Sequence, residues 1–369
     1  MINKARLKNN FLDLVQIPSP SLKERAVADF LKSQLTSLGL EVFEDEAGKE
    51  VGSDSGNIIG ILGSENKNRV LFSAHMDTVL PCDKITPVID GDIIKTDGTS
   101  VLGGDDKAGI AAIIEMLTLI KEKNLPHPEI VVIFSISEEI GLKGAKLVND
   151  DIIKDVNYGF VIDSGGKAGI ATIAAPYSAK GKIEIIGKSS HAGKPEKGIN
   201  AFVVASHAVS KLTIGRVDDE TTCNIGAVSG GTAVNIVMEK VEMTFEARSQ
   251  SLAKLEALLE KTNNTFEEVC KSFGAKLINE VKKGTSGYNI SLDSNIIKLF
   301  ENARKNTDLE FKAVSSQGGS DANVYNSKGI PTLNLSVGMS EVHTVNEFIN
   351  INDIADCTKL LLELVNLTK

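Results

Sequence analysis

Short apolar runs alternate with helical patterns over the first 174 residues, and this alternation constrains the fold more than any other feature. Runs at 57–62, 70–74, 129–136 and 158–162 have the length of buried strands. Residues 108–121 read AGIAAIIEMLTLIK, which is typical of a helix. Strands that alternate with helices indicate an α/β fold with a mixed, mostly parallel sheet covered by helices on both faces.

A capping signal predicts a helix near the start of the chain. Ser21 and Glu24 have the spacing of a capping box, in which the two side chains satisfy backbone N–H groups at a helix start. Apolar residues then recur with a helical period as far as Leu38, and Gly39 follows. We therefore expect a helix that begins after Ser21 and ends before Gly39.

The pattern changes near residue 174, where a second domain is predicted. Its elements follow the order β-α-β-β-α-β, the split βαβ arrangement of ferredoxin-like α+β domains. They are expected at 178–187, 200–212, 221–228, 233–248, 251–273 and 276–282. After residue 284 the α/β character returns, with a helix at 292–304, a strand at 331–337 and a helix at 351–367. Residues 175–284 are therefore predicted to be an insertion, and 1–174 with 285–369 to form one domain.

Composition excludes some classes of function. The chain has 369 residues, which suits two domains, and its net charge of −9 disfavours nucleic acid as a partner. No run approaches the roughly 18 apolar residues of a membrane span, and the first residues lack a secretory signal. The spacing of the four cysteines fits neither a disulfide framework nor a zinc knuckle. These features favour a cytoplasmic protein with no membrane partner.

Potential metal ligands follow the apolar runs. In an open α/β sheet the carboxyl ends of the strands meet at one edge, so residues remote in sequence can share one pocket there. The candidates are His75, Asp105, Glu138, Glu139, Asp163 and His343, and Asp77 can support the His75 ring from the same side of the strand. Two histidines with several carboxylates suit two divalent metals that share one carboxylate, zinc above all, with cobalt or manganese able to substitute.

Each candidate also has a plainer interpretation. His75 could be a buried histidine, Asp105 or its neighbour Asp106 a carboxylate favoured at a helix start, and Asp163 a turn residue. Glu138 and Glu139 could be a solvated pair, and His343 a surface residue. All of these plainer interpretations would have to be correct for residues that meet at one edge of the sheet. The joint pattern therefore favours a hydrolytic metal centre.

Five motifs carry a resemblance to a known family. H-M-D-T-V at 75–79, G-G-D-D-K-A-G at 103–109, S-E-E-I-G at 137–141, D-S-G-G at 163–166 and the late His343 occur in family order. They resemble the cocatalytic zinc exopeptidases, which include peptidase T, carboxypeptidase G, bacterial dipeptidases and aminoacylases, and D-D-K-A-G is most similar to the peptidase T branch.

The resemblance implies a zinc exopeptidase-like fold and a role for each matching residue. His75, Asp105 and Asp163 would hold one zinc ion, and Asp105, Glu139 and His343 would hold the other. Asp77 would orient His75, and Glu138 would be the general base. The chain would thus bind two zinc ions per subunit.

The inserted domain resembles the lid of the same family through GKSSHAGKPEKGINA at 187–201. This implies that His191 stabilises the oxyanion, in many members by reaching the active site of a partner subunit, and that the chain forms a homodimer through the lid. GGTAVNIV implies that Asn235 lies near substrate, and FEARS implies that Arg248 meets a substrate carboxylate.

The resemblance implies a peptidase T-like aminopeptidase that releases the N-terminal residue from tripeptides or other short peptides. A dipeptidase or an N-acyl amino acid amidohydrolase stays open, because specificity contacts lie in loops. SSQGGSDANV departs from the arginine and threonine common in tripeptidases at this place. A catalytically silent binding module is a third possibility, which the complete set of ligands and base disfavours.

Overall fold

The computed structural model describes residues 2–369, which divide into two compact units. Asn289–Lys369 joins the residues up to Ala174 in the first unit, and Ala175–Tyr288 forms the second. The second unit extends past the strand that ends at Lys283, because Gly284 donates its N–H to the Ser178 carbonyl at 2.8 Å. Within residues 2–369, no helix has the length and apolarity needed to cross a membrane.

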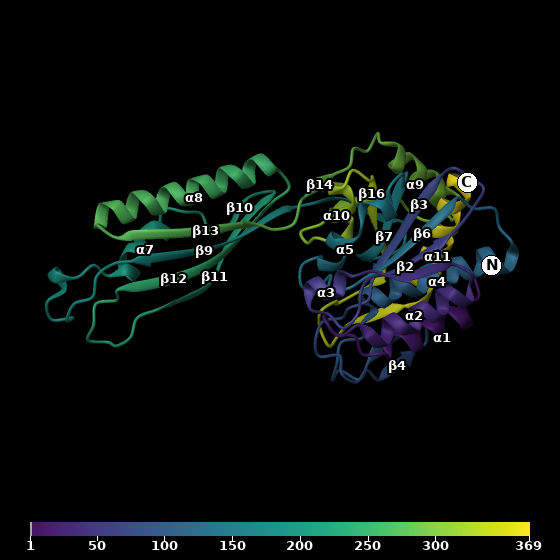
Figure 1. The fold of residues 1–369 in the computed structure, drawn as a ribbon, viewed down its shortest axis with the longest axis horizontal. Helices are drawn as coiled ribbons and strands as arrows, with labels where there is room; N and C mark the ends of the chain where they lie inside the picture. The colour runs from purple at the N-terminus through teal and green to yellow at the C-terminus, as the bar shows by residue number, and fades with distance from the viewer. Residues whose placement is uncertain (1) are drawn as a thin grey trace. The chain divides into compact units, whose positions relative to one another are not determined.

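The first unit is built on a sheet that, counted over the described residues, has nine strands (Figure 1). Strands β6, β3, β7 and β16 lie side by side and run parallel, whereas β1 and β2 extend the sheet antiparallel at one end. The order is β1 (Glu41–Glu44), β2 (Ile58–Leu62), β6 (Glu129–Ser135), β3 (Arg69–His75), β7 (Tyr158–Gly165), β16 (Thr332–Met339), β8 (Ile170–Ala175) and β14 (Tyr288–Asn289), with β15 (Lys312–Ser315) beside β8. The predicted mixed, mostly parallel sheet is confirmed.

Helices cover both faces of this sheet. Helix α4 (Gly104–Lys123) contacts β3, β7 and β16 on one face and packs against α1 (Lys4–Val15) and α11 (Ile351–Thr368). On the other face, Ser73 of β3 lies 3.1 Å from the hydroxyl of Tyr325 in α10 (Asp321–Ser327). The remaining elements of the unit are α3 (Ala47–Val51), α5 (Lys143–Leu147), α6 (Asp150–Ile153), α9 (Asn295–Lys305), and a small sheet of β4 (Pro87–Asp90), β5 (Ile93–Thr96) and β17 (Phe348–Asn350).

Helix α2 (Arg25–Ser37) corrects the capping-box prediction. Its end agrees with the sequence, since Gly39 adopts a left-handed φ of 79°. At its start, Glu24 occupies the N-cap position without a side-chain cap hydrogen bond. Ser21 instead donates to Asp77 at 2.6 Å, and the Glu24 carboxylate accepts from Ser137. The spacing of Ser21 and Glu24 predicts a capping box, but both side chains bind residues that are remote in sequence. A rule based on local spacing takes no account of such contacts.

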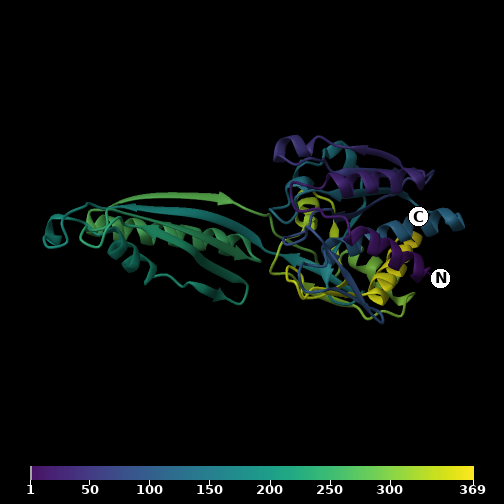
Figure 2. The same cartoon turned by 90° about the horizontal axis from the view of Figure 1, so that it is seen from below.

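The second unit is a five-stranded antiparallel sheet, counted over its described residues, with two helices on one face (Figure 2). The elements are β9 (Tyr177–Ile186), a 3-10 turn (Pro195–Lys197), α7 (Ala201–Val209), β10 (Gly215–Asp218), β11 (Thr221–Gly230), β12 (Lys240–Ser249), α8 (Leu252–Phe273) and β13 (Lys276–Lys283). The sheet order is β10-β11-β12-β9-β13. The short β10 adds to the predicted arrangement, and β12 begins at Lys240 rather than at residue 233.

Candidate metal centre

The carboxyl ends of four adjacent parallel strands and the start of α4 bring together seven residues singled out from the sequence. Strand β3 ends at His75, β7 carries Asp163, and Asp105 lies in the first turn of α4. The acidic pair follows β6, and His343 follows β16. A cleft of about 210 Å³ opens here, lined in part by His75, Asp105, Glu138, Glu139, Asp163 and His343.

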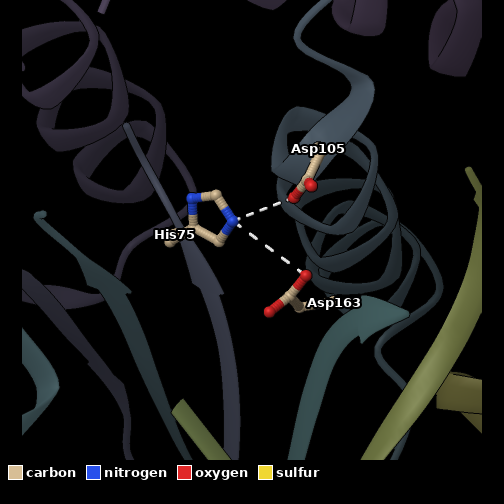
Figure 3. Close-up of side chains that lie close together, drawn as sticks. All are labelled: His75, Asp105 and Asp163. Atoms are coloured by element: carbon tan, nitrogen blue, oxygen red, sulfur yellow. Dashed lines mark hydrogen bonds and ion pairs between the residues drawn. The ribbon is translucent and has the colours of Figure 1, made fainter. Parts of the chain in front are cut away.

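Asp105 lies at the centre of the cluster, with its two carboxylate oxygens facing different histidines. Its Oδ1 is 3.0 Å from Nε2 of His75, and its Oδ2 is 3.2 Å from Nε2 of His343. Figure 3 shows that Nε2 of His75 also points toward Asp163, whose Oδ1 is 4.0 Å away. A carboxylate in this position can offer one oxygen to each of two cations.

Two groups of potential ligand atoms therefore overlap at Asp105. The first is His75, Asp105 and Asp163, and the second is Asp105, Glu139 and His343, with the atoms of each group within 4.8 Å of one another. Glu139 Oε1 lies 2.9 Å from His343 Nε2. A third group joins Glu138 and Glu139 to His75, so the Glu138 carboxylate is adjacent to both sets.

The electrostatics of the cluster suit bound cations. Burial, followed by the carboxylates of Asp163, Asp321 and Glu139, raises the pKa of Glu138 well above its usual range, against the opposing effect of His75. Burial and the neighbouring Asp105 likewise raise the pKa of Asp163. Carboxylates crowded together away from water disfavour each other's charge, and divalent cations among them would relieve the repulsion. The mixed imidazole and carboxylate donors fit zinc and similar metals.

Asp77 supports three residues of the cluster at once. Its Oδ1 accepts the backbone N–H of Glu138 at 2.8 Å, and its Oδ2 accepts that of Glu139 at 3.2 Å. On its other side, Nδ1 of His75 lies 2.9 Å from the Asp77 carbonyl oxygen and 3.5 Å from its Oδ1. These contacts leave Nε2 of His75 turned toward the carboxylates.

Three further residues hold the backbone of the candidate ligands, a role that was not predicted from the sequence. Glu347 accepts the N–H of Gly103 at 2.8 Å and of Asp105 at 2.9 Å. Asn334 accepts the N–H of Asp163 at 3.0 Å and donates to its carbonyl at 2.7 Å. Asp106 accepts the N–H of His75 at 3.2 Å. A polar Asn334 inside an apolar strand, and a glutamate four residues after His343, were the available signals.

The remaining three candidates, His191, Asn235 and Arg248, lie in the second unit. The first two come together, because Ala192 donates its N–H to the Asn235 carbonyl at 2.9 Å. Arg248 lies toward the far end of β12 from that loop, roughly 26 Å along the strand from Lys240 at about 3.3 Å per residue. It pairs with Glu246 at 3.1 Å. The unit therefore does not bring Arg248 to the other two residues.

The chain is similar to several known proteins over most of its length. The family model described as peptidase family M20/M25/M40 matches residues 71–367. The solved structure of aminopeptidase PepT from Bacillus cereus is 39% identical, with a TM-score of 0.95 and coverage of 100% of this chain and 99% of that chain. A tripeptidase from Staphylococcus aureus is 35% identical, with a TM-score of 0.96 and coverage of 100% and 99%. Among curated proteins, the uncharacterized protein YqjE of Bacillus subtilis is 39% identical over 99% of both chains.

Proposed function

Because the chain belongs to the peptidase family M20/M25/M40 and is a metallopeptidase, we propose that it releases the N-terminal residue from tripeptides or other short peptides. One observation carries the hydrolytic assignment: the two oxygens of Asp105 face the two histidines at 3.0 and 3.2 Å. The similarity to a PepT aminopeptidase and a tripeptidase over nearly their whole lengths supports the peptide specificity.

The cofactor of this proposal is a pair of zinc ions, for which cobalt or manganese can substitute. His75, Asp105 and Asp163 would hold one ion, and Asp105, Glu139 and His343 the other, in keeping with the two overlapping groups of donor atoms. When bound, two such cations activate a water molecule and polarise the scissile carbonyl.

Glu138 is proposed as the general base. Its carboxylate lies beside both groups of ligand atoms without belonging to either set proposed to bind zinc. It would accept the proton of the attacking water and then deliver that proton to the leaving amine. Asp77 would keep Glu138 and His75 in place through the contacts described above. His191 would stabilise the oxyanion, with Asn235 and Arg248 contacting substrate.

A homodimer through the second unit is part of the proposal, and the two edges of its sheet support it. Edge strand β13 carries lysines and a glutamate, which protect an edge from pairing. Residues 224–230 of β11 carry no charge and, within the described chain, pair with β12 alone. Val228 on this edge and Phe202 on α7 are 54% and 52% exposed.

Four cysteines without disulfides among the described residues accord with the proposed cytoplasmic location.

Hydrolysis of matched tripeptides, dipeptides and N-acetylated amino acids by the zinc-loaded protein, with identification of the products, tests the specificity. We expect release of the N-terminal residue from tripeptides, and loss of this activity on chelation. Cleavage confined to dipeptides or acylated amino acids would keep the chemistry and refute the tripeptide preference.

Glu138→Ala tests the assignment of the base. We expect turnover to be abolished while the metal content, measured by elemental analysis, stays at two ions per chain. A variant that binds two ions and retains near-native kcat would show that another group takes the proton.

A further inference from the structure

We propose that Glu24 is a positioning residue for the reaction, and that it acts by fixing the loop from which Glu138 projects. The inference rests on the assignment of Glu138 as the general base. Glu24 lies at the start of α2, more than a hundred residues from that loop in sequence. The local pattern had pointed to a role in helix capping, which the structure does not support.

The surroundings of Glu24 are unusual for a carboxylate. Its side chain is buried, with 0% of the residue exposed. Oε1 accepts the N–H of Ser137 at 3.1 Å, its hydroxyl at 3.0 Å and the N–H of Leu22 at 2.9 Å. Oε2 accepts the hydroxyl of Ser53 at 2.5 Å. A carboxylate is costly to bury unless its oxygens are hydrogen-bonded, and these four donors meet that requirement.

Ser137 is the link between Glu24 and the base. It directly precedes Glu138 and adopts a left-handed φ of 53°, which is unfavourable for a residue other than glycine. Such a conformation persists only where the surroundings hold it. The two hydrogen bonds from Ser137 to Glu24 supply that restraint on its N–H and on its hydroxyl.

Two buried carboxylates thus share the backbone of one short segment. The N–H of Ser137 points to Glu24, and those of Glu138 and Glu139 point to Asp77. Ser21 completes the connection, because it donates to Asp77 at 2.6 Å from the same segment that carries Glu24. The segment before α2 therefore fixes the backbone of the acidic pair, through Glu24 directly and through Ser21 and Asp77.

The decisive variant is Glu24→Leu, which keeps the bulk of the side chain and removes every acceptor. Displacement of a reacting group by about 1 Å can cost about 100-fold in rate. We expect kcat to fall about 100-fold, with KM within about threefold of native and two metal ions per chain. Glu24→Gln should retain most of the activity, because its amide oxygen can accept from Ser137 while its nitrogen faces the Ser53 hydroxyl.

Two comparisons separate positioning from general loss of stability. Glu115→Leu removes another buried carboxylate, which pairs with Arg6 at 2.7 Å, and should lower Tm with kcat within about twofold of native. In a Glu138→Ala background, Glu24→Leu should not reduce the residual rate further, since a residue that acts through the base has nothing left to position.

The outcomes distinguish the inference from the proposed function. If Glu138→Ala retains native kcat, the assignment of the base fails first. Suppose that Glu138→Ala is inactive, and that Glu24→Leu folds, binds two metal ions and turns over at the native rate. The positioning role of Glu24 is then wrong, and the assignment of the base stands. Should Glu24→Leu not fold, Ser137→Ala decides: a fall in kcat at constant KM and metal content supports the inference, and unchanged kcat overturns it.

Discussion

Several carboxylates around the cleft accept hydrogen bonds from backbone N–H groups. Asp77, Glu24 and Glu347 each accept N–H groups from residues in or beside the cluster of ligands. A carboxylate that accepts backbone N–H bonds makes strong, directional contacts with groups that cannot rotate away. The backbone of each loop that carries a candidate ligand is consequently fixed, and so is the point from which the ligand side chain projects.

Glu347→Leu should weaken metal binding. The change removes the acceptor for the N–H of Gly103 and Asp105, and partners behind a metal ligand typically contribute 10- to 100-fold to affinity. We expect a loss of about this size in zinc affinity, measured by competition with a chelator. The exposed Glu341 of the same loop provides the control, since Glu341→Gln should bind normally. Equal affinities for the two variants would contradict a role for Glu347.

The candidate ligands and Asp77 could be predicted at the residue scale, whereas the supporting residues Asn334, Glu347 and Glu24 could not. His75 and Asp163 stand out because each ends or follows an apolar run that local sequence reveals. The contact of Asn334 with Asp163 spans 171 residues, and that of Glu347 with Asp105 spans 242. No local periodicity records such contacts, and the same limit caused Glu24 to be misassigned.

Helix α2 and strand β1 are joined through one carboxylate. Glu44 accepts from Arg25 at 3.0 Å, from Lys32 at 3.1 Å and from the N–H of Gly56 at 2.9 Å. Burial alone raises the pKa of Glu44, but these hydrogen bonds outweigh it and lower the pKa to about 2. The edge of the sheet is thus tied to its covering helix by an interaction that requires an ionised carboxylate.

The contribution of Glu44 to stability should depend on pH. Since its pKa is lower in the folded than in the unfolded chain, the stabilisation is complete above about pH 4.5 and is lost as the pH falls toward about 2. Glu44→Gln should therefore lower the free energy of unfolding by about 1–3 kcal/mol at pH 7. Urea unfolding at several pH values would show the difference from native shrinking below pH about 4.5. A difference independent of pH would refute this account.

Some long elements agreed closely with their sequence patterns, whereas several short strands left no pattern to predict. Helix α8 and strand β6 match the predicted bounds within one residue, because a full apolar face or run marks them. Strands β1 and β15 have four residues each, too few to show a period. Helix α4 is assigned from Gly104, but Asp105 and Asp106 have non-helical backbone angles, so its regular part begins close to the predicted residue 108.

At the scale of the whole molecule, one chain builds two units with separate cores. The sheet of the first unit packs against α4 and its neighbours, and the second unit has its own buried cluster between α7, α8 and the sheet. The catalytic candidates divide between them, with the metal ligands in the first unit and His191 in the second. The activity proposed here consequently depends on both units.

Val228→Glu should convert the proposed dimer to monomers. A charge on the uncharged part of β11 disfavours pairing of two edges, whereas the same change at Val281 falls on an edge already rich in charge. Sedimentation should give the mass of two chains for native protein and for Val281→Glu, and of one chain for Val228→Glu. A native mass equal to one chain would remove the dimer from the proposal.

The order of the ligands along the chain bears on how the enzyme is made. His75, Asp105 and Asp163 all precede the second unit, whereas His343 follows it. During synthesis the ribosome therefore releases His75, Asp105 and Asp163 early. His343, the last residue of the second group, emerges only after the inserted unit. If these residues bind the metals as proposed, a growing chain without His343 has an incomplete second site, and we expect no peptide hydrolysis before His343 has been synthesised. Synthesis itself thus delays the proposed activity until the inserted unit has been made.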